Sequence, residues 1–135
     1  MKTMFDLNVI LDVVANRAPW VAESARACSL ATQGRRKAFV SPHVVTTLYY
    51  LVRKYADRAA AENAVDKVAA LFDFASCGRD VFRRARELPI ADFEDAVVVA
   101  AAEAVGCSCI VTRNLNDFVN SSIRAASPQE FCHAL

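Results

Sequence analysis

The chain has 135 residues and a mass of 14.8 kDa, a length typical of one folded domain with its own hydrophobic core. Hydrophobic residues make up 55% of the chain and charged residues 23%, with only 3 Gly and 4 Pro, which excludes a disordered chain and favours a helix-rich globular protein. The net charge of +1 excludes a strong overall attraction to nucleic acid or membranes. A polyanionic partner would therefore have to be held by local basic groups or by a bound metal.

The cysteines and the apolar segments indicate a reducing compartment and no membrane. Five cysteines, an odd number without a CxxC pair, are typical of reduced core residues: Cys28, Cys77, Cys107, Cys109 and Cys132. A zinc site lacks partners, because His43 and His133 are the only histidines. Asp6 interrupts the N-terminus before an export signal can form, and the apolar tract at 96–111 is shorter than the roughly 20 residues of a spanning helix. We expect a cytoplasmic protein with no membrane partner.

In chain order, the apolar periodicity and the turn residues predict strands separated by helices. The strands are expected at residues 4–5, 38–40, 72–75 and 107–112. Helices are expected from about residue 7, and at 19–34, 42–54, 57–71, 80–87, 92–105 and 128–131.

Capping residues support several of these boundaries. Ser41 followed by Pro42 fits an N-cap with proline in the first turn of a helix. Gly106 is suited to end the helix that Asp92 begins, and the segment 127–130 has the pattern of a capping box. Strands and helices in this alternation predict a three-layer α/β/α domain with a mainly parallel central sheet, which we expect to occupy residues 1–135 as a single domain.

Acidic and amide side chains follow the predicted strands. In parallel sheets, ligands bind at the carboxyl ends of the strands. Asp6 follows the first strand, Asn114 and Asp117 follow the last one, and the acids at 92–95 open the helix that leads into it. We therefore expect these side chains to meet at one edge of the sheet.

Each acid also has an ordinary structural explanation. Asp92 and Asp95, three residues apart, fit an N-cap and a first-turn acid favoured by the helix dipole. Asp6 would fit the cap of the helix that follows it, and Asp117 would fit a turn. Independent caps have no reason to converge at one end of a sheet, and this convergence favours a binding site.

The converging groups are all oxygen donors. Carboxylates held close together repel one another and take up protons more readily unless a cation lies between them. Hard oxygen ligands favour Mg²⁺ or Mn²⁺ over zinc, and such a cation can bind a phosphodiester and activate water. The candidate ligand residues are Asp6, Asp92, Glu94, Asp95, Asn114 and Asp117.

Four motifs, in this order, resemble those of the PIN domain ribonucleases, and among them the VapC-like toxins of bacterial toxin–antitoxin pairs. Residues 5–12 resemble the opening Asp-x-Asn motif, 41–42 the start of the third helix, 92–96 the central acid motif, and 110–118 the closing Thr-x-Asp/Asn and Asp-Phe motif. The resemblance covers nearly the whole chain. It implies a PIN fold, metal-dependent cleavage of RNA with Mg²⁺ or Mn²⁺, frequent homodimers, and an antitoxin that blocks the cleft.

Position by position, the resemblance makes Asp6, Asp95 and Asp117 the catalytic acids. Asp6 and Asp95 would be the first and second metal ligands, and Asp117 would orient metal or water. Further candidate ligands and supporting residues are Asp92, Glu94, Asn8, Thr112 and Asn114. Arg113 is the candidate RNA phosphate contact, with an ordinary surface arginine as the alternative.

Two residues depart from the family pattern. Thr47 stands where many members have a glutamate, and Asn114 stands where many have an aspartate. Fewer anionic ligands predict weaker metal binding, so a degraded site that binds RNA or a protein without cutting is the alternative function. A haloacid dehalogenase-like phosphatase ranks last, because Asn8 stands where that chemistry needs an acid.

One basic cluster lies outside these motifs. Its arginines are Arg79, Arg83, Arg84 and Arg86. We favour a solvated helix face, paired with Asp80 and Glu87, over a stripe that contacts RNA.

Overall fold

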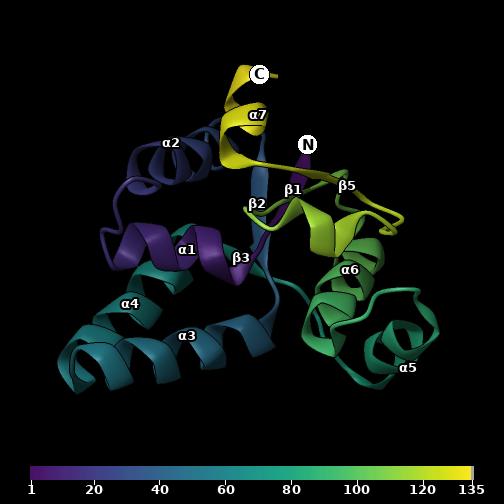
Figure 1. Cartoon of the computed structure of the whole chain (residues 1–135), viewed down its shortest axis with the longest axis horizontal. Coiled ribbons are helices and arrows are strands. Elements are labelled where there is room, and N and C mark those ends of the chain that lie inside the picture. The colour runs from purple at the N-terminus through teal and green to yellow at the C-terminus, as the bar shows by residue number, and fades with distance from the viewer. Residues whose placement is uncertain (135) are drawn as a thin grey trace.

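A five-stranded sheet forms the centre of the computed structural model, which describes residues 1–134 (Figure 1). The strands lie in the order β3-β2-β1-β4-β5, and all neighbouring strands are parallel. Their bounds are Lys2–Phe5 for β1, Lys37–Val40 for β2, Asp73–Phe74 for β3, Cys109–Val111 for β4 and Arg124–Ala126 for β5.

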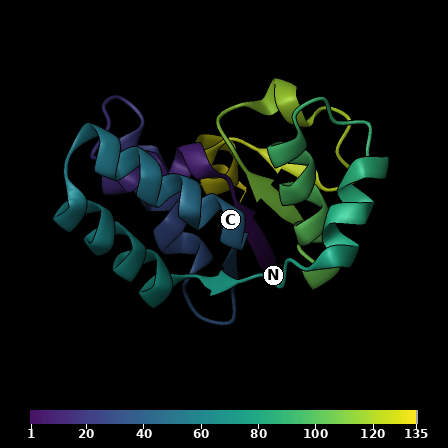
Figure 2. The same cartoon turned by 90° about the horizontal axis from the view of Figure 1, so that it is seen from below.

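Helices lie on both sides of this sheet. Their bounds are Leu7–Val14 for α1, Val21–Ala31 for α2, Pro42–Tyr55 for α3, Arg58–Leu71 for α4, Arg79–Glu87 for α5, Phe93–Val105 for α6 and Pro128–His133 for α7. Helices α1 to α4 lie on one side and α5 and α6 on the other, as Figure 2 shows. The predicted three-layer α/β/α fold is thereby confirmed. Within the described residues, no helix has the length and apolarity needed to cross a membrane.

The predicted elements are present, with three differences. The second helix spans Val21–Ala31 instead of 19–34, because Pro19 and Trp20 form a turn before it and the chain turns again at 32–35. A short 3₁₀ helix, η1 (Leu115–Phe118), occupies the expected loop after β4. Strand β5 was not predicted, since it has only three residues, one arginine and two alanines, which have low strand propensity.

Helix α6 begins with the acidic segment at the cleft and continues into the core. Its buried residues form a continuous run, Ala96 to Ala102, so the middle of the helix is enclosed on all sides. Asp92 caps its N-terminus, and Gly106 ends it with a left-handed backbone at φ +79°, a conformation that glycine adopts without steric cost. The helix therefore has a fixed start, and its first turn faces the carboxyl edge of the sheet.

The cysteines are free thiols, as predicted. Four of the five are buried, and burial raises the pKa of Cys28 to about 12. These thiols stay protonated at neutral pH and pack as small apolar groups.

Candidate active site

An open cleft of about 350 Å³ lies at the carboxyl end of the sheet, where the strand order reverses between β1 and β4. Its lining residues are Asp6, Leu7, Asn8, Leu11, Asp92, Glu94, Asp95, Asn114 and Asp117. Every candidate ligand from the sequence lies in this lining. The cleft has five carboxylates and no lysine or arginine among these residues.

Asp6 lies at the base of the cleft in a fixed position. The register pairs Phe5 with Val111, so Asp6 and Thr112 come next on adjacent strands. The Thr112 hydroxyl donates to Asp6 Oδ2 at 2.8 Å, and the Leu7 N–H donates to Oδ1 at 2.9 Å, which makes Asp6 the N-cap of α1. Burial, with 6% of the residue exposed, raises the pKa of Asp6 although both hydrogen bonds lower it.

The first turn of α6 supplies the second group of acids. The Asp95 N–H donates to Asp92 Oδ1 at 3.0 Å, so Asp92 is the predicted N-cap and lines the cleft as well. Burial raises the pKa of Asp95 to about 7, with further contributions from the negative charges of Asp6, Asp92, Asp117 and Glu94. Capping and convergence on the cleft are both present, so the two interpretations of the sequence are compatible.

The loop after β4 is held against α1 by backbone and amide groups. The Arg113 N–H donates to Asn8 Oδ1 at 3.2 Å, and Asn8 Nδ2 donates to Asp6 Oδ2 at 3.4 Å. The Asn114 N–H donates to the Thr112 hydroxyl at 3.0 Å. Asn8, Thr112 and Asn114 thus lie where the sequence placed supporting residues, and they connect the loop to Asp6.

The Arg113 side chain is engaged away from the acids of the cleft. Its guanidinium donates from Nε to Asp12 Oδ2 at 2.6 Å and from Nη2 to Oδ1 at 3.1 Å, and it lies 4.0 Å from the centre of the Trp20 ring. Asp12 is fully buried, and it also accepts a hydrogen bond from Ser24 and forms a salt bridge with Arg17. The predicted phosphate contact would have to compete with this buried ion pair, which the spacing of the sequence did not reveal.

A second contact that the sequence did not indicate supports Glu94. His43 is partly buried, and its Nε2 lies 3.2 Å from the carbonyl oxygen of Glu94. Burial lowers the pKa of His43, so the ring is neutral at pH 7; Nε2–H donates to this carbonyl, and Nδ1 accepts from the Ser41 hydroxyl at 2.6 Å. Thr47, the departure from the family pattern, donates to Glu94 Oε2 at 3.4 Å.

The donor set of the cleft suits a hard, hydrated cation. Within residues 1–134, no three acidic, imidazole or thiol side chains are gathered closely enough to form a complete metal cage. Mg²⁺ commonly keeps several water ligands and uses one or two carboxylates together with substrate phosphate. Asp6 and Asp95 are the strongest candidates for those carboxylates, because the pKa of each is raised and the negative charge of Asp6 contributes to the shift at Asp95.

Comparison with known proteins gives a consistent set of similarities. A sequence model of the PIN domain matches residues 2–116. The chain is 26% identical over 136 residues to Ribonuclease VapC1 of Aquifex aeolicus, covering 97% of this chain and 93% of that protein.

Solved structures show the same fold at low sequence identity. VapBC2 from Rickettsia felis bound to promoter DNA matches with a TM-score of 0.77 and 15% identity, covering 94% of this chain and 98% of the other. A toxin–antitoxin complex from Klebsiella pneumoniae matches with a TM-score of 0.70 and 19% identity, covering 93% and 97%.

Proposed function

Since this chain belongs to the PIN domain family, we propose that it is a metal-dependent endoribonuclease that hydrolyses RNA phosphodiester bonds as the toxin of a toxin–antitoxin pair. The observation that carries this proposal is the cleft in which Asp6, Asp95 and Asp117 meet without a basic side chain to balance them. The similarity to a ribonuclease over 97% of the chain supports RNA as the substrate.

The acidic residues of the cleft have different roles in the proposed reaction. Asp6 is held by Leu7 and Thr112, so it offers a fixed oxygen. Asp95 has a pKa of about 7 and is thus partly protonated at neutral pH, and a cation held beside it would favour its deprotonated form. Asp117, across the cleft, adds negative charge to both. When bound, Mg²⁺ or Mn²⁺ supplies Lewis-acid activation of water and of the phosphodiester group.

The test of this proposal is cleavage of a mixed pool of structured RNAs by the purified chain, with Mg²⁺ or Mn²⁺ against EDTA. Asp6→Asn and Asp95→Asn should reduce cleavage to the level seen with EDTA while the variants stay folded by circular dichroism. Asp66→Asn, an exposed acid on α4, is the matched control and should cleave normally. Normal cleavage by Asp6→Asn with metal present would contradict the assignment.

A second candidate function is a binding module that holds RNA or protein without cutting. Thr47 and Asn114 favour it, because they stand where many family members have acidic residues and so leave fewer anionic ligands for a metal. RNA binding by the folded wild type, with no cleavage of the whole pool in the presence of Mg²⁺ or Mn²⁺, would support this function and exclude the nuclease.

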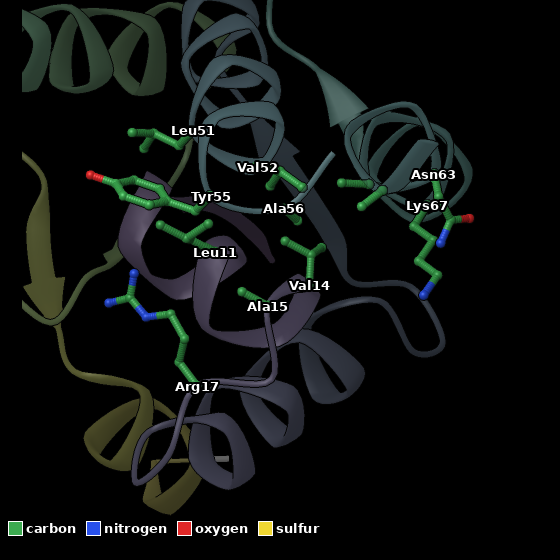
Figure 3. Close-up of a pocket in the computed structure, with 12 residues that line it drawn as sticks. Leu11, Val14, Ala15, Arg17, Leu51, Val52, Tyr55, Ala56, Asn63 and Lys67 are labelled. Carbon is green, nitrogen blue, oxygen red and sulfur yellow. The ribbon is translucent and has the colours of Figure 1, made fainter. Parts of the chain in front are cut away.

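The antitoxin is part of the proposal, and an apolar groove gives it a place to bind (Figure 3). The groove, of about 470 Å³, lies between α1, α3 and α4, and its lining includes Leu51, Val52 and Tyr55. Leu11 lines both this groove and the acidic cleft, so a peptide in the groove can reach the acids. Leu51→Lys should weaken inhibition by the purified antitoxin and leave RNA cleavage unchanged.

Light scattering tests the homodimer that the family resemblance implies.

A further inference from the structure

The exposed face of α5 carries basic and aromatic residues in one stripe. With about 100° between successive residues of a helix, four exposed side chains fall within an arc of about 100°. They are Arg79, Phe82, Arg83 and Arg86. Val81 and Ala85, on the other side of the helix, are buried. The face is therefore presented to solvent by a helix whose opposite side is anchored against α6.

The arginines of α5 differ in their partners. Arg84, outside the stripe, donates to Glu103 at 2.9 Å and lies 3.6 Å from Glu87. Across the described residues 1–134, the three arginines of the stripe form no salt bridge. The pairing that the sequence suggested thus applies to Arg84 and Glu87 alone. Three cationic groups on one face are left for an external anion.

Two exposed phenylalanines connect this face to the acidic cleft. Phe82 is 40% exposed and Phe93 is 46% exposed, and their ring centres are 6.1 Å apart. Phe93 is the first residue of α6, between Asp92 and Glu94, which both line the cleft. A chain that leaves the cleft at this end meets Phe93 first, then Phe82 and the arginines around it.

We infer that a substrate-binding surface, made of Arg79, Phe82, Arg83, Arg86 and Phe93, holds a single-stranded segment of the RNA substrate and leads it to the cleft. The inference rests on the proposed function and extends it. Arginines bind phosphates, and exposed aromatic rings stack with unpaired bases without regard to sequence. Bases inside a duplex are stacked on their neighbours and cannot reach such rings, so the surface selects unpaired segments.

Local charge is the reason that RNA fits this surface better than a second copy of the chain. A two-fold contact through this face would bring the arginines of one copy toward those of the other, which is unfavourable. The carboxylates of the cleft repel RNA, and a net charge of +1 supplies little attraction. The substrate-binding surface provides positive charge beside the place where the phosphodiester must lie.

The test measures binding of a fluorescent, unstructured RNA of 20 nucleotides by anisotropy in EDTA, as a function of salt. Removing three phosphate contacts with Arg79→Ala, Arg83→Ala and Arg86→Ala together should weaken binding by at least about tenfold and reduce the slope of log K against log salt by about 2. The matched control is Arg35→Ala, Arg36→Ala and Lys37→Ala together, which removes the same charge at the amino end of β2. The control should change binding and slope much less.

The phenylalanines are tested separately. Phe82→Leu with Phe93→Leu keeps apolar side chains but removes the rings, so binding should weaken by roughly 5- to 150-fold for each base that loses its stacking partner. The salt slope should not change, because no charge is removed. Tyr50→Leu, which removes another exposed ring, on α3, is the control.

The outcomes separate this inference from the proposed nuclease. Equal loss of binding in both triple variants would overturn the inference, as would wild-type RNA binding that none of the variants changes, or no binding at all. A change of oligomeric state in the arginine or phenylalanine variants, with RNA binding intact, would identify a contact between copies and overturn it as well. Metal-dependent cleavage is measured separately with Mg²⁺. The proposed nuclease function can therefore be confirmed even if the proposed substrate-binding surface is contradicted.

Discussion

Helix α1 has one buried carboxylate near each end, each within a cluster of polar groups, and the two clusters differ in their counter-charges. Near its C-terminal end Asp12, fully buried, accepts hydrogen bonds from Arg113 and Ser24 and forms a salt bridge with Arg17. At its N-terminus Asp6 shares a cleft with other acids and with no basic side chain. The charge of a buried carboxylate that is paired with basic side chains is balanced within the protein. Acids without basic partners take up protons or bind a cation. The contrast separates a structural cluster from a candidate site in the same helix.

The two clusters are joined through the loop after β4. Thr112 bonds to Asp6, and the next residue, Arg113, pairs with Asp12. The ion pair therefore fixes the segment that also carries Asn114 and Asp117 into the cleft. A substitution at Asp12 should therefore affect the stability of the fold more than metal binding in the cleft. A substitution at Asp95 should affect metal binding more than stability.

The largest effect on stability is expected from Asp12→Asn. It leaves the Arg113 guanidinium, whose side chain is only 19% exposed, without its anionic partner. Breaking a buried ion pair from one side costs about 3–5 kcal/mol, which urea unfolding would measure. The exposed acid variant Asp66→Asn should change the free energy of unfolding by less than about 0.5 kcal/mol. A loss below about 1 kcal/mol for Asp12→Asn would mean that the two clusters do not differ as described.

The next effect is stabilisation by metal. A cation that binds only the folded chain raises the free energy of unfolding by about 2.7 kcal/mol at a concentration 100 times its Kd. Thermal unfolding of the wild type should therefore shift upward with Mg²⁺ or Mn²⁺. Asp95→Asn should lose most of this shift, since it removes one of the two carboxylates expected to hold the ion. An equal shift in both proteins would place the cation elsewhere.

A smaller effect is the pH dependence of the metal-free chain. The pKa of Asp95 is raised from 3.8 to about 7, and that of Asp6 is raised as well, so the folded state binds protons more tightly than the unfolded state. This contribution to stability is present at acidic pH and is lost as the pH rises from about 4 to about 7. Asp95→Asn should flatten the curve in that range. A wild-type stability that rises through this range to the same extent as the variant would contradict the raised pKa.

The sequence predicted the parts of this comparison that depend on local pattern. The alternation of strands and helices, the cap at Asp92, the stop at Gly106 and the gathering of acids at the carboxyl edge follow from periodicity, capping chemistry and the rule for parallel sheets. The order of the strands within the sheet was not predicted. It did not predict the Asp12–Arg113 pair, because the two residues are 101 positions apart and nothing local links them. Likewise, no spacing rule joins His43 to the backbone of Glu94.

The smallest predicted effect concerns the second arginine on Asp12. Arg17 lies 3.2 Å from Asp12 Oδ1, but its side chain is 35% exposed, and Asp12 keeps Arg113 and Ser24 when it is removed. Arg17→Gln should therefore cost no more than about 1 kcal/mol, while Arg113→Gln should cost clearly more in the same urea experiment. Equal losses would mean that both arginines are needed to balance the buried charge. The expected inequality would show that the arginine next to the cleft holds this end of α1, and that the loop carrying Asn114 and Asp117 is fixed by it.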